Sequence, residues 1–137
     1  MSHYQFVTRS DLVEVRDAGG MGRGVFAVSR IPADTLLFSD PVMPVPGDQC
    51  PEGSVLDAIV FRWSAAVGDG LGRGAIVLGL GTVLNHSRSP NVVVSFERDP
   101  DRVDFYALRD IGPGEQLSHD YGYDEYPPEW GSGSRED

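Results

Sequence analysis

The residue types that could do chemistry are concentrated in two short polar motifs. Asn85-His86-Ser87 lies past the middle of the chain, and Asp120-Tyr121 lies near its end. The first motif also matches the glycosylation sequon, but the N-terminus shows no secretory signal, which leaves that match without weight. Taken alone, the two motifs are equally typical of a loop with local side-chain bonds and of a half-buried tyrosine. Neither identifies a reaction without its setting.

A glycine-rich motif precedes both, at residues 22–27, which read GRGVFA. It fits the loose dinucleotide pattern G-x-G-x-x-A, which requires a strand before it and a helix opening on it. Here a β-branched and aromatic run follows, and Pro32 then disfavours a helix. We therefore exclude a dinucleotide site. Two alternatives remain: a simple hairpin turn, or a turn whose backbone approaches a ligand closely.

Metal and hydrolytic chemistry have little support. The soft metal ligands of the chain are His3, Cys50, His86 and His119. No pair has the spacing of a zinc site, so we expect no metal, and a lone cysteine excludes an internal disulfide. Glu115, His119 and Asp120 could suggest acid–base catalysis, but neighbouring positions on a strand face opposite ways.

The elements that must position these motifs are mostly strands. We expect strands at residues 12–15, 25–28, 36–38, 92–96 and 103–108, the last two forming a hairpin. One short helix is expected after Ser54, where apolar residues recur at helical spacing, although the segment around Phe61 could equally be a strand. Residues 39–54 carry four prolines and are expected to form a loop.

Length and charge bound the function. The 137 residues suit one domain, and no apolar run is long enough to cross a membrane. The net charge of −10 argues against direct nucleic-acid binding and suits a basic protein or peptide partner, although solubility alone would explain it equally well.

We expect an intracellular protein, cytoplasmic in a bacterium and otherwise cytoplasmic or nuclear. Residues 131–137 are expected to be a disordered polar tail.

The order and spacing of the three motifs resemble the SET-domain family of protein-lysine methyltransferases. Residues 22–27 resemble its first glycine motif, residues 80–91 its central asparagine–histidine motif, and residues 109–122 its last motif. The likeness extends from about residue 12 to about residue 126. It implies that the SET domain occupies residues 1–130, with an insert at about residues 40–80.

The resemblance implies a mostly β fold, the β-clip, made of small curved sheets. In this fold the last motif passes under a loop near the central motif, a knot-like threading that is rare among proteins. The cofactor and the substrate lie on opposite faces, and a narrow channel through the domain joins them.

The family's cofactor is S-adenosylmethionine, and its contacts transfer position by position. The backbone at Gly22, Arg23 and Gly24 is expected to border the methionine part. Asn85 is expected to bind the amino-acid end, and the main chain at His86 the adenine. Tyr121 is the expected catalytic residue, and its hydroxyl also meets the cofactor's reactive methyl group.

Substrate-channel residues follow from the same resemblance. His119 stands where relatives that methylate histones usually have phenylalanine or tyrosine, a position that tunes how many methyl groups are added. Many relatives complete the channel with cysteine-rich zinc flanks, which this chain lacks. The aromatic residues Tyr123, Tyr126 and Trp130 could close that wall instead, or they could only pack the C-terminus.

The expected function is therefore transfer of methyl groups to a lysine of a basic protein, of which a histone or histone-like protein is one example. The chain contains no lysine of its own to methylate. The alternative is a catalytically inactive SET-like module that binds a basic peptide. A non-lysine substrate is a third reading. Dimerisation could complete the groove of so small a domain, so a homodimer is one assembly that the sequence allows.

Overall fold

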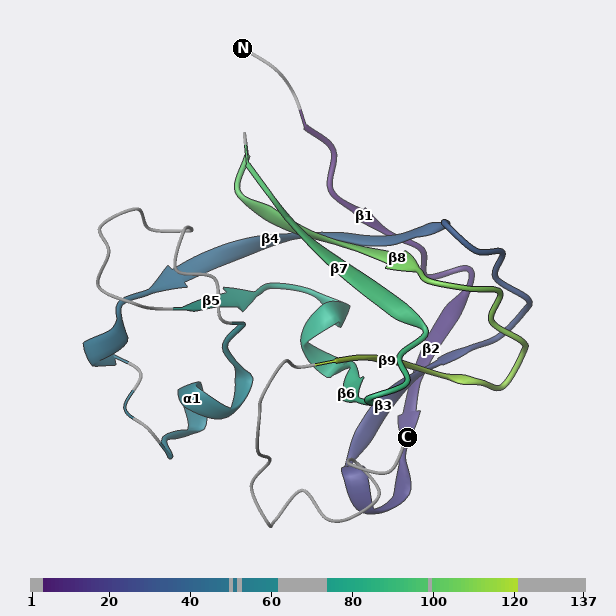
Figure 1. The fold of residues 1–137 in the computed structure, drawn as a ribbon, viewed down its shortest axis with the longest axis horizontal. Helices are drawn as coiled ribbons and strands as arrows, with labels where there is room; N and C mark the ends of the chain where they lie inside the picture. Colours follow the sequence, from purple (N-terminus) through teal and green to yellow (C-terminus); the bar gives the residue numbers. More distant parts are fainter. Residues whose placement is uncertain (1–3, 50, 52, 62–73, 99, 121–137) are drawn as a thin grey trace.

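A computed structural model of the protein describes residues 4–49, 51, 53–61, 74–98 and 100–120 (Figure 1). The described part is mostly β, as predicted, and is built from two small sheets. It includes one α-helix, α1, at Val55–Ile59, and three short 3-10 turns, at Gly19–Met21, Gly47–Gln49 and Leu80–Val83. No helix within these described ranges is long and apolar enough to span a membrane.

The larger sheet is antiparallel throughout and has the order β1-β4-β8-β7, with β5 paired to β4 beside this path. Its strands are β1 Val7–Thr8, β4 Leu36–Val45, β5 Gly74–Val77, β7 Val92–Glu97 and β8 Arg102–Ala107. The predicted hairpin is confirmed as β7–β8, in register from Val92 opposite Ala107 to Glu97 opposite Arg102. The connecting sequence, RDPD at residues 98–101, has the composition typical of turns.

The prediction of a loop over residues 39–54 is wrong for its first part, because β4 continues to Val45. Pro41 lies at the end of the β4–β8 ladder and accepts the Leu78 N–H at 2.9 Å, while Pro44 pairs with Ala75 of β5. A proline removes only a donor, and it can stay in a strand where its missing N–H is not needed by a neighbour. Composition alone did not show that these positions meet that condition.

The smaller sheet has the order β2-β3-β9-β6. Its strands are β2 Val13–Asp17, β3 Arg23–Ala27, β6 Asn85–His86 and β9 Gln116–His119. β2 and β3 form the predicted antiparallel hairpin, whose glycine turn needs φ of +68° at Gly19 and +79° at Gly22. β6 and β9 run parallel, so two segments whose paired residues are 33 positions apart lie side by side at the sheet edge (Figure 1).

The core lies between the two sheets and unites their strands. Its fully buried side chains include Val25, Ile31, Leu37, Phe38, Phe105, Ile111 and Leu117. Phe38 of β4 meets Phe105 of β8 edge to face, with ring centroids 5.8 Å apart. Leu117 places β9 in the same core, and this burial fixes which face of β9 is left for polar chemistry.

The segment after β4 contains the predicted helix at its first turn, and an isolated β-bridge follows at Phe61. α1 ends at Ile59, and Phe61 then forms an antiparallel bridge with Ala75, with both N–H···O distances 2.8 Å. The rest of the expected helix, the polar tail at residues 131–137 and the chain that would complete the knot-like threading lie outside the described residues.

Candidate active site

The three sequence motifs meet at the side chain of Asn85. Its Nδ2 donates to the backbone carbonyl of Arg23 at 3.0 Å and to Oε1 of Gln116 at 2.7 Å. Arg23 belongs to the glycine motif on β3, and Gln116, which lies within the last motif, is the first residue of β9. The half-buried amide of Asn85 therefore joins β3, β6 and β9 at one point.

Gly24 shows why the first motif needs a glycine at this point. A Cβ built on Gly24 would lie 2.5 Å from Gln116 Oε1, 3.0 Å from Asn85 Nδ2 and 3.2 Å from the Ala18 Cβ. These distances are shorter than the contacts that carbon makes in close-packed proteins. The space that a side chain would fill here is already occupied by the amides of Asn85 and Gln116.

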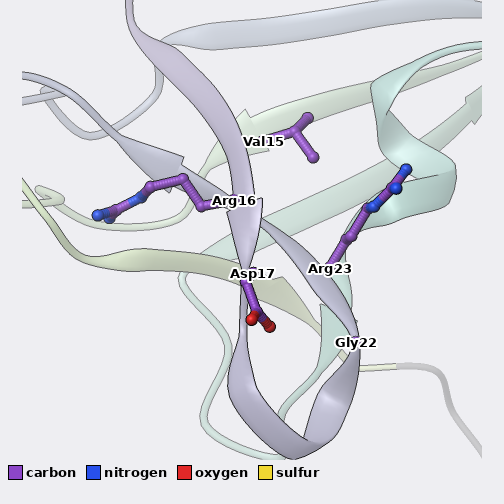
Figure 2. Close-up of a pocket in the computed structure, with 5 residues that line it drawn as sticks. All are labelled: Val15, Arg16, Asp17, Gly22 and Arg23. Carbon is purple, nitrogen blue, oxygen red and sulfur yellow. The ribbon is translucent and has the colours of Figure 1, made fainter.

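Next to this junction, the tip of the β2–β3 hairpin bounds an open pocket with a volume of about 600 Å³, lined by Val15, Arg16, Asp17, Gly22 and Arg23. Figure 2 shows Arg16 pointing away from Arg23, which extends on the side of the 3-10 turn that precedes β6. Arg16 lies over the ring of Phe26 at 4.1 Å. No atom lies within 4 Å of a Cβ built on Gly22, so its backbone faces open space. The volume is in the range of small-molecule sites.

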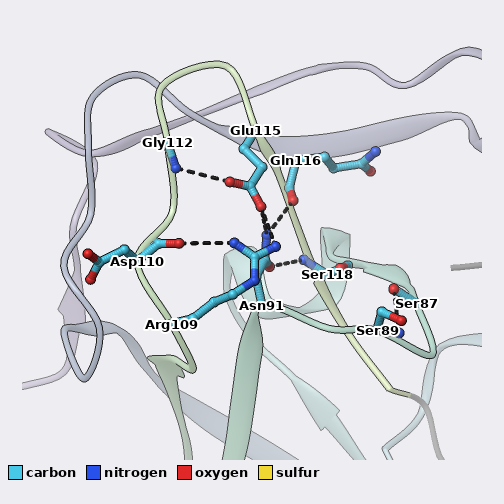
Figure 3. A network of polar contacts seen from close by, with 9 residues as sticks. All are labelled: Ser87, Ser89, Asn91, Arg109, Asp110, Gly112, Glu115, Gln116 and Ser118. Carbon is cyan, nitrogen blue, oxygen red and sulfur yellow. Dashed lines mark hydrogen bonds and ion pairs between the residues drawn. The ribbon is translucent and has the colours of Figure 1, made fainter.

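A network centred on Asn91 holds β9 in place (Figure 3). The buried Asn91 donates to the Gln116 carbonyl at 2.8 Å and to Glu115 at 3.1 Å, and its Oδ1 accepts the Ser118 N–H at 2.9 Å. Glu115 also accepts a hydrogen bond from Arg109 at 2.5 Å, which lowers the pKa of this carboxyl to about 2. Glu115 is therefore a fixed anion that braces the strand, and it does not serve as an acid near pH 7.

His86 and His119 are partners in the parallel β6–β9 ladder, and both are buried. The Ser87 N–H donates to the His119 carbonyl at 3.1 Å, which continues the ladder. His86 Nδ1 lies 3.8 Å from an Asp120 carboxylate oxygen. The main chain from Asn85 to Ser87 is thus fixed by β9, the strand that precedes Asp120 and Tyr121 in the sequence.

The imidazole of His119 lies in an aromatic environment. It stacks on Phe61 with ring centroids 5.3 Å apart and 11° between the planes, and it meets Phe105 edge-on at 6.3 Å. Burial is the main cause that lowers the pKa of His119 to about 4, assisted by the neighbouring His86. His119 is accordingly neutral at pH 7 and contributes to an apolar wall.

The comparisons with known proteins decide the family. A model of the SET domain matches residues 22–122, which include all three motifs. The chain belongs to the SET-domain family. A histone-lysine N-methyltransferase of Schizosaccharomyces pombe, specific for lysine 37 of histone H3, is 35% identical over 119 residues, covering 85% of this chain and 76% of that protein. The predicted family and its enzyme class, protein methyltransferase, are confirmed.

Solved structures confirm the SET fold. A Plasmodium falciparum protein proposed to be a histone methyltransferase matches with a TM-score of 0.63 and 19% identity, over 85% of this chain and 97% of that one. The structure of Kryptonite in complex with mCHG DNA and SAH matches with a TM-score of 0.61 and 22% identity, over 81% of this chain and 23% of that one. At these identities the likeness concerns the fold.

The structure brings the predicted site residues that it describes into one region, together with residues that were not predicted. Gly22, Arg23, Gly24 and Asn85 lie at or beside the hairpin pocket, and His86 and His119 pair on β6 and β9. The predicted residues Tyr121, Tyr123, Tyr126 and Trp130 lie outside the described residues. Within the described ranges, no group of three metal-ligating side chains occurs.

Three residues that contact the candidate site were not predicted as site residues: Gln116, Asn91 and Phe61. Gln116 and Asn91 stand inside the quoted motifs, and only the parallel pairing of β6 with β9 shows what they contact. Phe61 is distant in sequence from every motif, and its packing against His119 arises from the Phe61–Ala75 bridge. Its aromatic character was the one signal available from sequence.

Proposed function

We propose that this SET domain transfers methyl groups from S-adenosylmethionine to a lysine side chain of a basic protein. The observation that supports this best is the β6–β9 register, in which Asn85 lies opposite Ser118 and His86 opposite His119. It sets the polar Asn85 junction, which suits the cofactor, next to the aromatic wall around His119, which suits a lysine chain.

The residues of the polar side fit the cofactor's chemistry. S-adenosylmethionine carries an amino-acid end, an adenosine and a positive sulfonium. The Gly22 backbone offers a surface without side-chain obstruction, and the Arg23 side chain offers a cation for a carboxylate. Asn85 would bind the amino-acid end, and the main chain at His86 the adenine.

The residues of the aromatic side fit a lysine that must lose its proton. Near pH 7 a free lysine amine is neutral in roughly one molecule in a few thousand. The neutral imidazole of His119 and the rings of Phe61 and Phe105 add no charge to this wall. Such a lining disfavours the ammonium form and keeps water from the reacting amine.

When bound, S-adenosylmethionine supplies a methyl group already activated by its sulfonium sulfur. The lysine nitrogen forms the new N–C bond as the C–S bond breaks, the electron pair goes to sulfur, and an amine proton goes to water. The protein's part is to align and dry the amine, for which alignment alone contributes a large share of the barrier reduction. We assign the orientation of the amine to the hydroxyl of Tyr121.

A histone-type basic tail is the proposed substrate class. The acidic balance of the chain, 11 basic against 21 acidic residues, attracts such a segment. The Schizosaccharomyces pombe relative acts on a histone lysine, and it resembles this chain over most of both lengths.

The test is methyl transfer from labelled S-adenosylmethionine to recombinant histone H3 and to a lysine-free H3 control, with the product identified by mass spectrometry. Wild type should label lysines of H3, and Tyr121→Phe should lose most of the activity while binding S-adenosylhomocysteine normally. Equal transfer by Tyr121→Phe would overturn the role of Tyr121. Peptide or cofactor binding without turnover in wild type would instead show the inactive binding module.

A further inference from the structure

We propose that Asp40 is a positioning residue for the reaction, and that its carboxylate holds the 3-10 turn Leu80–Val83 in the arrangement from which β6 pairs correctly with β9. The inference rests on the proposed S-adenosylmethionine dependence and adds to it a residue of the larger sheet that belongs to none of the three sequence motifs. Asp40 acts through the turn, which leads directly into β6 (Figure 1).

The carboxylate of Asp40 extends from β4 to the backbone of this turn. Its Oδ2 accepts the Gly81 N–H at 3.1 Å, and both residues are buried. The turn has no local side chain for this purpose, because the residue that precedes it is Gly79. A side chain from a distant strand therefore does what a capping residue would do locally.

Missing side chains in the turn leave the space that the Asp40 carboxylate occupies. A Cβ built on Gly79 would overlap Asp40 Oδ1, and a Cβ built on Gly81 would lie 3.0 Å from Oδ2. The backbone of Gly79 is extended, with φ of 178°, a conformation that any residue adopts. It is therefore the approach of the carboxylate, and not the backbone angle, that requires glycine at position 79.

The Gly81 peptide transmits this constraint to β6. Its carbonyl accepts the Leu84 N–H at 3.4 Å, and the buried Leu84 is the residue directly before Asn85. The Thr82 hydroxyl donates to the Val77 carbonyl of β5, which anchors the other side of the turn. A shift of the Gly81 peptide would therefore move the start of β6, and with it the amide that joins β3 to β9.

The carboxylate of Asp40 lowers the stability of the fold, which favours a functional reason for its presence. Burial, together with the Asp104 carboxylate, raises the pKa of Asp40 to about 6 despite the Gly81 N–H. A raised pKa means that the ionised form destabilises the folded protein near pH 7. Charge-assisted hydrogen bonds are about twice as strong as neutral ones, so the ionised carboxylate is the acceptor that best fixes the turn.

The test compares binding of S-adenosylhomocysteine to wild type, Asp40→Leu and Asp40→Asn by calorimetry at pH 8. Asp40→Leu removes the acceptor and should weaken binding about tenfold, because apparent affinity falls with the fraction of molecules whose site is correctly arranged. Asp40→Asn keeps an oxygen for the Gly81 N–H and should stay within about threefold of wild type. In methyl-transfer assays, Asp40→Leu should raise the KM for S-adenosylmethionine and leave the KM for an H3 peptide nearly unchanged.

Ser39→Ala is the matched control on the same strand. Ser39 is also buried, but its side chain faces the other side of β4, where it donates to Asp104 at 2.6 Å. Ser39→Ala should lower the free energy of unfolding and leave S-adenosylhomocysteine affinity within about twofold wherever the protein remains folded. Equal losses of affinity in Ser39→Ala and Asp40→Leu would trace the effect to damage of β4 and would overturn the inference.

Gly79→Ala provides an independent test if Asp40→Leu does not fold. It places a methyl group where the Asp40 carboxylate lies, so it should weaken S-adenosylhomocysteine as Asp40→Leu does. In Asp40→Ala, where the carboxylate is absent, adding Gly79→Ala should cost no further affinity. Wild-type affinity in Gly79→Ala, or additive losses in the double variant, would overturn the inference and leave the proposed function standing. Wild type that does not bind S-adenosylhomocysteine would overturn the proposed function, and this inference with it.

Discussion

At the scale of single residues, burial shifts the pKa values of His119 and Asp40 in opposite directions. His119 is only 6% exposed, and burial lowers its pKa to about 4. Asp40 of β4 is only 2% exposed, and burial, with the Asp104 carboxylate, raises its pKa to about 6 despite the Gly81 N–H that it accepts. Acid therefore destabilises the fold through His119 and stabilises it through Asp40.

The His119 contribution can be isolated by His119→Phe. In the unfolded chain a histidine titrates near its ordinary pKa of 6.5, so between pH 6.5 and 4 the unfolded state binds more protons than the folded one. The free energy of unfolding of wild type, relative to His119→Phe, should fall by about 2 kcal/mol from pH 7 to pH 5. Urea titrations at both pH values measure this. Equal acid sensitivity of the two proteins would contradict a neutral buried His119.

The Asp40 contribution has the opposite sign and is isolated by Asp40→Asn. Because the folded-state pKa lies above the ordinary 3.8, stability is lost as pH rises from about 4 through 6. Asparagine keeps an oxygen for the Gly81 N–H and does not ionise, so Asp40→Asn should be more stable than wild type by about 1–3 kcal/mol at pH 8. The difference should vanish near pH 4.

The control for this titration is Asp11→Asn, which changes an exposed carboxylate paired with Arg9 at the surface. Exposed ion pairs contribute little to stability because water screens them. Asp11→Asn should therefore show no comparable pH-dependent gain. If both substitutions stabilised the protein equally at pH 8, the gain would reflect the lowered net charge and not the burial of Asp40.

The sequence could predict which motif residues belong to the candidate site. It could not predict what their side chains contact. Asn85 and His86 stood out because their order relative to the other motifs is specific. The hydrogen bond between Asn85 and Gln116 and the stacking of Phe61 on His119 depend on contacts between segments far apart in the chain. No local pattern encodes such contacts, because periodicity reports only which face of one element is buried.

At the scale of elements, the β2–β3 hairpin is positioned by the absence of a side chain at Gly24. Gly24→Ala would place a methyl group 2.5 Å from Gln116 Oε1 and 3.0 Å from Asn85 Nδ2. We expect it to lower the free energy of unfolding by about 1–3 kcal/mol, as overpacking does, and to weaken S-adenosylhomocysteine binding by separating the two amides. Denaturant titration and calorimetry measure the two effects.

Gly20→Ala is the matched control in the same hairpin. A Cβ at Gly20 meets no atom within 4 Å, and Gly20 has no positive φ. Its substitution should change stability by no more than about 0.5 kcal/mol, as surface changes usually do, and should leave ligand binding intact. If Gly20→Ala were as harmful as Gly24→Ala, the hairpin would be sensitive to backbone stiffness, and the close approach at Gly24 would not be the cause.

Elements were predictable where a strand is long enough to show alternation or where a turn has distinctive residues. The β7–β8 and β2–β3 hairpins satisfy both conditions. β1 and β6 have two residues each and show no period, and β4 continues through Pro41 and Pro44 because their ladder positions need no donor. The parallel pairing of β6 with β9 depends on the global chain path, which composition does not specify.

At the scale of the whole molecule, the chain is strongly acidic, and several of its arginines form ion pairs with nearby carboxylates. Arg9, Arg16, Arg30 and Arg109 each form an ion pair with an acidic side chain at 2.5–3.1 Å. These pairs leave the excess of acidic residues, 21 against 11 basic ones, as the net field of the protein. Such a field acts at long range on a basic partner and scarcely contributes to the fold.

This field predicts how methyl transfer depends on salt. Raising NaCl from about 20 to 200 mM shortens the Debye length from about 20 to about 7 Å, which screens the approach of a basic tail. The KM for a lysine- and arginine-rich H3 peptide should rise several-fold, while kcat changes little, because the chemistry occurs in a dry site. S-adenosylhomocysteine is the control ligand: its net charge is near zero, so its Kd should stay nearly constant. A salt-independent KM would show that substrate recognition relies on local contacts, and that the acidic balance serves solubility alone.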